Sequence, residues 1–259
     1  MTDYYLFLYN CSIEHNLLYM GIKYKVNESF FKKWTQEMAY TLGYIYADGS
    51  LEDAAYIRGK YLRVSSIERN SIEKIKKWLS SEHTIISVFP KTRNGKVGYL
   101  LRIGSHELYN DLVKLGLYPN KSLTIKFPSI PKKYLSHFVR GYFDGDGCVR
   151  IDMKKGKQKP LILNKLCTIF TSGSREFLQE LAVQVHSAIE TDLLKVYNGH
   201  GSFMLSYTTG DSVKIFKWIY GKVKGNVYLE RKAMVYSRYF QLRPERLDRK
   251  VKSILQYLG

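Results

Sequence analysis

The feature that most constrains this chain is a helical segment that occurs twice and ends in Asp-Gly both times. The first copy ends in TLGYIYADGS and the second ends in VRGYFDGDGC. The copies correspond in register at five positions, which pair Gly43 with Gly141, Tyr44 with Tyr142, Ala47 with Gly145, Asp48 with Asp146 and Gly49 with Gly147. Five such correspondences are hard to reach by chance, so we expect two related halves.

The segments that follow the two helices repeat one order of helices and strands. The first half predicts a helix at 29–47 with Ser29 as N-cap, strands at 50–57 and 61–66, a helix at 70–82, strands at 84–91 and 96–103, and a helix that Ser105 caps. The second half predicts a helix that begins at Pro131, strands at 149–153 and 161–171, a helix at 174–190, strands at 193–198 and 202–208, and a helix that Asp211 caps. A repeat of about 100 residues is too long for a solenoid and indicates tandem duplication of a small domain.

This order predicts an α+β protein of two tandem αββαββα domains. We expect the first domain at 29–118 and the second at 131–242. Residues 119–130 are the expected linker, because the stretch around them holds three of the six prolines. Residues 1–28 are then an N-terminal extension, and residues 243–259 are a C-terminal helical tail.

The charge of the chain indicates a polyanionic partner. Its 41 Lys and Arg against 23 Asp and Glu give a net charge of +18, which nucleic acid or an anionic membrane surface would neutralise. No run of 18 apolar residues occurs, and the first residues lack the basic start of a signal peptide. Nucleic acid is therefore the expected partner, without membrane association.

The cysteines exclude two further classes of protein. Cys11, Cys148 and Cys167 are odd in number, far apart and never in CxxC spacing. Neither a zinc ribbon nor a disulfide framework fits them. We expect a soluble protein of a reducing compartment.

Small residues form a stripe on each repeated helix. Gly43 with Ala47, and Gly141 with Gly145, are four residues apart and share one helical face. Two such stripes allow helices to pack backbone to backbone. We expect this helix interface to join the two halves and to bring the helix C-termini together.

The aspartates at those C-termini predict a metal site. A carboxylate is disfavoured at the negative end of the helix dipole, and Asp48 and Asp146 would also repel each other. Divalent cations held by oxygen ligands and shared with a DNA phosphate would relieve both effects. Magnesium is the expected ion.

The repeated motif resembles that of the LAGLIDADG homing endonucleases, in the single-chain form with two copies. The segments LGLYPNKS, FPSIP and FVRGYFDGDG are also typical of the family, and the resemblance covers roughly residues 29–240. Neither copy spells the family name. The leading Leu is Thr41 or Val139, and the first Asp is Tyr46 in one copy and Asp144 in the other.

The resemblance implies a fold, a reaction and a partner. The fold would have pseudo-twofold symmetry, with the motif helices at the interface and saddle-shaped antiparallel sheets on DNA. The activity would be site-specific hydrolysis of both DNA strands, dependent on Mg²⁺ or Mn²⁺ and leaving 3′ overhangs. Ca²⁺ would support binding without turnover. The partner would be double-stranded DNA with a long, nearly asymmetric site, and the protein would be a monomer.

The resemblance also implies roles for particular residues. One aspartate would serve each active site, Asp48 and Asp146, each aided as a metal ligand by the preceding backbone carbonyl, that of Ala47 or Gly145. The family keeps a basic residue near each site to neutralise charge in the transition state. The lysines at the expected places are Lys121 and Lys232. Lysines are plentiful in this chain, so the position of these two is a weaker signal than that of the aspartates.

Base recognition is expected on the hairpins, because a two-stranded ribbon fits the major groove. The candidates are Arg58, Lys60, Arg63, Arg93, Lys96 and Arg102 in the first half, and Arg150, Lys154, Lys155, Lys157, Lys159, and Lys195 in the second. The run KKGKQK at 154–159 would ordinarily be a solvated loop. Because it lies between two proposed groove-facing strands, a role in DNA binding is as well supported as a solvated loop.

The motif and the function each have a competing interpretation. An isolated Asp-Gly after a helix is usually a cap and turn, but the duplicate favours a shared role. The DGDG string at 144–147 does not fit a calcium loop, because Val149 stands where that loop needs glycine. The functional alternative is a non-cleaving nucleic-acid binder of the same fold, an intron-splicing maturase or a transcription regulator. The presence of both aspartates favours cleavage.

Overall fold

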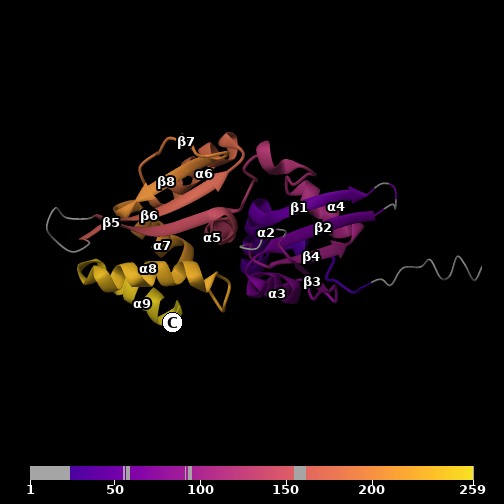
Figure 1. Cartoon of the computed structure of the whole chain (residues 1–259), viewed down its shortest axis with the longest axis horizontal. Helices are drawn as coiled ribbons and strands as arrows, with labels where there is room; N and C mark the ends of the chain where they lie inside the picture. The colour runs from indigo at the N-terminus through magenta and orange to yellow at the C-terminus, as the bar shows by residue number, and fades with distance from the viewer. Residues whose placement is uncertain are drawn as a thin grey trace, which may run out of the picture.

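Two four-stranded antiparallel sheets, each with its own helices, lie on either side of a pair of central helices (Figure 1). A computed structural model describes residues 24–54, 56, 59–90, 92, 95–154 and 162–258. The predicted α+β class and the duplicated architecture are confirmed.

The first sheet has the strand order β1-β2-β4-β3. Its strands are β1 (Gly49–Ala54), β2 (Gly59–Ser66), β3 (Ile85–Val88) and β4 (Gly98–Gly104). The helices of this half are η1 (Phe30–Lys32), α2 (Gln36–Asp48), α3 (Arg69–Trp78) and α4 (His106–Lys114). The connection to the second half contains the 3-10 turns η3 (Lys121–Leu123) and η4 (Lys132–Tyr134).

The second sheet repeats this order as β5-β6-β8-β7. Its strands are β5 (Gly147–Lys154), β6 (Ile162–Ser172), β7 (Tyr197–Asn198) and β8 (Phe203–Thr208). Its helices are α5 (Leu135–Asp146), α6 (Arg175–Ile189) and α7 (Thr209–Tyr220), followed by α8 (Glu230–Leu242), η5 (Pro244–Arg246) and α9 (Arg249–Leu258).

Each central helix runs directly into the first strand of its own sheet. Gly49 follows the last residue of α2 and pairs with Val64, and Gly147 follows α5 and pairs with Phe170. One face of each sheet carries the buried apolar side chains and packs on helices, as at Leu62 and Leu205. The opposite, open face is more polar.

The two central helices touch through their glycines, as the small-residue stripes predict. A Cβ built on Gly43 would lie 2.0 Å from the carbonyl oxygen of Phe138, and one built on Gly141 would lie 2.0 Å from that of Tyr40. Only glycine leaves room for such a contact. The aromatic side chains of Tyr44 and Tyr142 are buried in the surrounding core.

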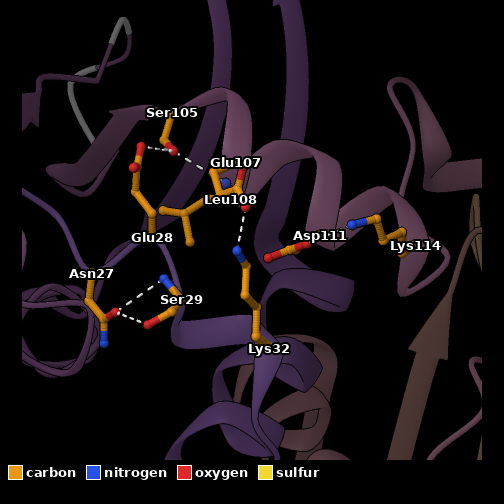
Figure 2. Close-up of polar contacts among 9 residues, drawn as sticks. All are labelled: Asn27, Glu28, Ser29, Lys32, Ser105, Glu107, Leu108, Asp111 and Lys114. Atoms are coloured by element: carbon orange, nitrogen blue, oxygen red, sulfur yellow. Dashed lines mark hydrogen bonds and ion pairs between the residues drawn. The ribbon is translucent and has the colours of Figure 1, made fainter.

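The N-terminal boundary of the first helix was predicted wrongly. Ser29 precedes only a 3-10 turn and makes no side-chain cap; its backbone N–H and its hydroxyl both donate to Asn27 Oδ1, over 3.1 and 2.8 Å (Figure 2). Helix α2 begins after Thr35, whose side chain accepts from the backbone N–H of Met38.

The other predicted caps and strand ends agree with the structure only in part. The Ser105 hydroxyl accepts from the N–H of Leu108 and donates to Glu28, which confirms it as N-cap of α4 (Figure 2). The prediction for Asp211 is wrong, since this residue lies inside the first turn of α7 and its carboxylate accepts from the N–H of Asp192. The strand expected at 193–198 is restricted to its last two residues.

No helix in the described parts of the chain is long and apolar enough to cross a membrane.

Candidate active site

Asp48 and Asp146 are the last residues of the two central helices, so their carboxyl groups meet at one end of the helix interface. A Cβ built on Gly145 would lie 3.4 Å from Asp48 Oδ2, which places this carboxylate directly beside the end of α5. Such a Cβ would also lie 2.4 Å from the Cβ of Ala47. The structure therefore brings together all four residues expected around the metal.

The electrostatics of this pair favour the binding of a cation. Burial, and then repulsion from Asp146, raises the pKa of Asp48 to about 6. Burial also raises the pKa of Asp146 above its usual range, although Lys121 and Lys232 oppose the shift. Both carboxyl groups therefore hold their negative charge at a free-energy cost that a cation would relieve.

The two lysines lie where the carboxylates meet, and both are buried. Lys121, 4% exposed, donates from Nζ to the carbonyl oxygen of Tyr46 over 2.7 Å. Lys232, also 4% exposed, donates to carbonyl oxygens at the end of α5, at 2.6 Å to Gly147 and 2.9 Å to Asp144. Burial lowers the pKa of both ammonium groups.

These lysine contacts satisfy carbonyls that a helix end leaves without partners. They also set positive charge against the negative end of each helix dipole. The two lysines differ in how fully they are engaged. Lys232 Nζ also contacts the carbonyl oxygens of Phe143 and, at 3.4 Å, Gly145, whereas the single hydrogen bond found for Lys121 Nζ in the described parts of the chain goes to Tyr46.

The donor set suits a hard divalent cation. Carboxylate and carbonyl oxygens are the ligands of Mg²⁺, which keeps several waters and is often held by one or two carboxylates plus substrate phosphates. Within the described residues no group of three or more His, Cys, Asp or Glu side chains could hold an ion. A cation at Asp48 and Asp146 would thus complete its shell with water and phosphate oxygens, and the residues fit this role.

Asp144, to which the sequence assigned no role, connects three elements beside the pair. Its Oδ2 accepts from the Tyr40 hydroxyl of α2 over 2.8 Å and from the backbone N–H of Leu229, just before α8, over 2.8 Å. Its Oδ1 is buried without a partner among the described residues. The corresponding residue of the first copy, Tyr46, instead donates to the carbonyl oxygen of Leu115. The sequence signal available for Asp144 was that it keeps the first Asp of the family motif, which Tyr46 replaces in the other copy.

His137 is a packed residue of α5. Its Nδ1 lies 3.0 Å from Nη2 of Arg140, which is itself fully buried and donates to the carbonyl oxygens of Ile219 and Val227. Burial, with Arg140 next, lowers the pKa of His137 to about 4. These contacts join α5 to the end of α7 and to the segment that leads into α8.

A cavity of about 490 Å³ opens beside Asp48. Its walls include Arg63 of the first sheet, Asp144 and Gly145 of α5, and Arg231 of α8. A larger hollow of about 640 Å³ lies between α8 and α9 and contains neither carboxylate.

The predicted DNA-contacting residues fall into four groups. Arg63, Arg102 and Arg150 lie on open sheet faces, between strand neighbours that point toward the helices. Lys96, Lys154 and Lys195 are exposed at loops or strand ends. Lys60 lies on the helix-covered face, where it binds Asp53 and stands 4.4 Å from the ring centroid of Tyr109. Arg58, Arg93, Lys155, Lys157 and Lys159 lie outside the described residues.

Comparison with known families identifies the repeated unit. The family model described as LAGLIDADG-like domain matches residues 133–220, which hold the second central helix and most of the second sheet. These residues form a LAGLIDADG-like domain. The first half repeats the LAGLIDADG architecture element by element, with its own helix ending in Asp-Gly.

Solved structures show that the LAGLIDADG fold extends over both halves. The chain is similar to I-SmaMI bound to uncleaved DNA target in the presence of calcium ions (TM-score 0.52, 14% identity, 86% of this chain and 98% of that one). It is also similar to I-WcaI bound to its DNA recognition sequence (0.52, 13%, 85% and 95%) and to the LAGLIDADG homing endonuclease I-LtrWI bound to target DNA (0.52, 9%, 89% and 97%). At these identities the likeness establishes the fold.

Two curated proteins of Methanocaldococcus jannaschii match part of the chain. A reverse gyrase is 25% identical over 164 residues, and a probable translation initiation factor IF-2 is 31% identical over 126 residues. These matches cover 63% and 46% of this chain. The chain spans only 8% and 10% of the lengths of these relatives.

Proposed function

We propose that this protein is a site-specific endonuclease that hydrolyses both strands of DNA with a divalent metal and leaves 3′ overhangs. The observation that carries the proposal is the meeting of Asp48 and Asp146 at one end of the closely packed central helices. Both carboxyl groups have raised pKa values, and both stand between two sheets with exposed basic side chains. DNA-bound relatives of the same fold support the choice of substrate.

In this proposal Asp48 and Asp146 hold the metal, with the carbonyls of Ala47 and Gly145. Bound Mg²⁺ or Mn²⁺ would supply Lewis-acid chemistry, polarising a phosphodiester and lowering the pKa of a coordinated water. The chain contributes the backbone that carries the two carboxylates, because hydrogen bonds from Lys121, Lys232 and Thr171 hold the ends of the two helices. Asp146, for example, accepts from Thr171 through its carbonyl oxygen.

Lys121 and Lys232 place positive charge beside the carboxylates and fix the ends of the two helices. Their charge lowers the pKa of Asp48 and Asp146 against the effect of burial and so favours the ionised form of both. The same charge would stabilise a phosphate whose negative charge grows during hydrolysis.

The rest of the chain provides DNA binding. We propose that domains at 29–118 and 131–242, joined by residues 119–130, each present the open face of one sheet to the DNA. Lys60 is excluded from this set because its side chain lies on the opposite face. A long and nearly asymmetric target suits two sheets that carry different side chains. One chain supplies both central helices, so the protein should be a monomer.

The test is cleavage of DNA containing the intronless insertion site of the protein's own gene. Incubation with MgCl₂ should give two ends with 3′ overhangs, which sequencing of the ligated products would reveal. With CaCl₂ the protein should bind the same fragment without cutting it, because the looser coordination of Ca²⁺ positions water poorly. Specific binding without cleavage in Mg²⁺ or Mn²⁺ would favour a maturase or regulator.

A further inference from the structure

The guanidinium of Arg102 is held from two sides on the open face of the first sheet. Arg102 donates from Nε to Oε2 of Glu52 over 3.1 Å and from Nη2 to Oε1 over 2.9 Å. Its central carbon lies 3.4 Å from the ring centroid of Tyr61, which is a stacking distance. These residues come from β4, β1 and β2, so the register of three strands fixes the cluster.

Two glycines form the seat of the Tyr61 ring. A Cβ built on Gly59 would lie 2.4 Å from Cε2 of the ring, and one built on Gly104 would lie 3.1 Å from Cε1. A side chain at either position would displace the ring. The ring therefore lies close to the sheet and provides a fixed surface for Arg102.

The cluster leaves part of the guanidinium free. Arginine has five N–H donors, and Glu52 accepts from the single Nε–H and from one Nη2–H. The other Nη2–H and the two Nη1–H groups have no partner in the part of the chain that the structure describes. Nη1 of Arg63 forms a longer ion pair with Glu52, at 3.9 Å, so both hydrogen bonds that hold this carboxylate come from Arg102.

We propose that this free fork of Arg102 reads a guanine in the major groove, with Glu52 as its positioning residue. Guanine presents two adjacent acceptors there, O6 and N7, which match two parallel N–H groups of one arginine. A guanidinium already fixed by a carboxylate and a ring loses little freedom on binding, which sharpens discrimination. The assignment rests on the proposed function, since it needs the first sheet to lie in the groove.

The second sheet presents a different surface. Arg150 contacts Asp152 through Nε at 2.9 Å, its side chain is 57% exposed, and no ring supports it on the described open face. The guanine contact therefore belongs to one half of the target. This difference gives a physical reason for an asymmetric site.

Selection from a randomised DNA duplex library in CaCl₂ tests the assignment. The wild-type protein should enrich a site in which one position of one half is a guanine. Arg102→Lys keeps the charge but lacks the fork, so preference for that guanine should fall about 10- to 100-fold while the other positions keep theirs. Glu52→Gln should weaken preference at the same position.

The controls separate base reading from other roles. Arg243→Lys alters an ion-paired arginine between α8 and α9 and should leave every position unchanged. Uniform weakening by Arg102→Lys would mean a phosphate contact and would overturn the assignment. If Arg102→Lys fails to unfold cooperatively, Glu52→Gln and Tyr61→Leu replace it as the test. Both should weaken the preference for guanine at one common position, and weakened preference at other positions would overturn the assignment. Enrichment of no sequence by the wild type would overturn the proposed function as well.

Discussion

Gly43 on the first central helix lies directly against the carbonyl oxygen of Phe138 on the second. A Cβ built on Gly43 would stand 2.0 Å from that oxygen, and the reciprocal contact of Gly141 with Tyr40 is equally close. The distance between the two helices is therefore set by the absence of side chains. The position of Asp48 relative to Asp146 depends on this contact.

Gly43→Ala should destabilise the protein by about 1–3 kcal/mol, because the helices must separate to admit the methyl group. The measurement is urea unfolding followed by circular dichroism. Gly210→Ala is the matched control, since Gly210 lies in helix α7 and a Cβ built on it would have nothing within 4 Å. It should be neutral or stabilising by up to about 1 kcal/mol. Equal effects of the two changes would contradict the close contact.

Asp48→Asn should stabilise the metal-free protein at neutral pH. The folded-state pKa of about 6 lies above the unfolded value of 3.8, so the ionised carboxyl group opposes folding. The gain, about 1–3 kcal/mol, should be full above pH 6 and should disappear as the pH falls toward 4. Thermal unfolding in EDTA across this range, with Asp192→Asn as an exposed control, measures it. A variant less stable than wild type at pH 7.5 would contradict the account.

The two lysines should differ in their structural importance. Lys232→Met removes three hydrogen bonds to carbonyl oxygens and should cost about 2–4 kcal/mol, whereas Lys121→Met removes one and should cost about 1–2 kcal/mol. Chemical unfolding of both variants checks this order. The reverse order would mean that Lys121 is the main cap.

DNA affinity should fall steeply with salt, because phosphate neutralisation releases counterions. Each lost phosphate contact should lower the slope of log K against log salt by about 0.9. Replacing Lys154, Lys155, Lys157 and Lys159 by Gln should flatten the slope, whereas replacing four lysines near the C-terminal helices should not. The control set is Lys222, Lys224, Lys250 and Lys252. Identical slopes for the two sets would mean that residues 154–159 form a solvated loop without phosphate contacts.

The parts of the fold that depend on local sequence could be predicted. The spacing of Gly43, Gly141 and the two aspartates identified the helix interface, because each position is fixed by the period of a single helix. Ser105 was recognised as a cap for the same reason. Ser29 was wrongly predicted as a cap, because nothing in the sequence shows that Ser29 will bond to the side chain of Asn27.

Features that depend on strand register could not be predicted. The odd separation of Lys60 and Arg63 puts them on opposite faces of one strand, but only the packed structure shows that helices cover the face of Lys60. The contact of Arg102 with Glu52 joins two residues 50 positions apart, on strands β4 and β1. Nothing in the sequence indicates which carboxylate such an arginine will meet, and the same holds for Asp144 and Tyr40.

Cleavage of strand-labelled target DNA by Asp48→Asn, Asp146→Asn and the double variant tests the central claim most directly. Each substitution removes one anionic ligand but leaves the helix interface and the sheets, so binding in CaCl₂ should persist and cleavage in MgCl₂ should be greatly slowed. A single variant that slows both strands indicates a shared site, whereas one that accumulates nicks indicates two independent sites. The account predicts that the double variant does not cut both strands. Double-strand cutting by the double variant at the wild-type rate would contradict it.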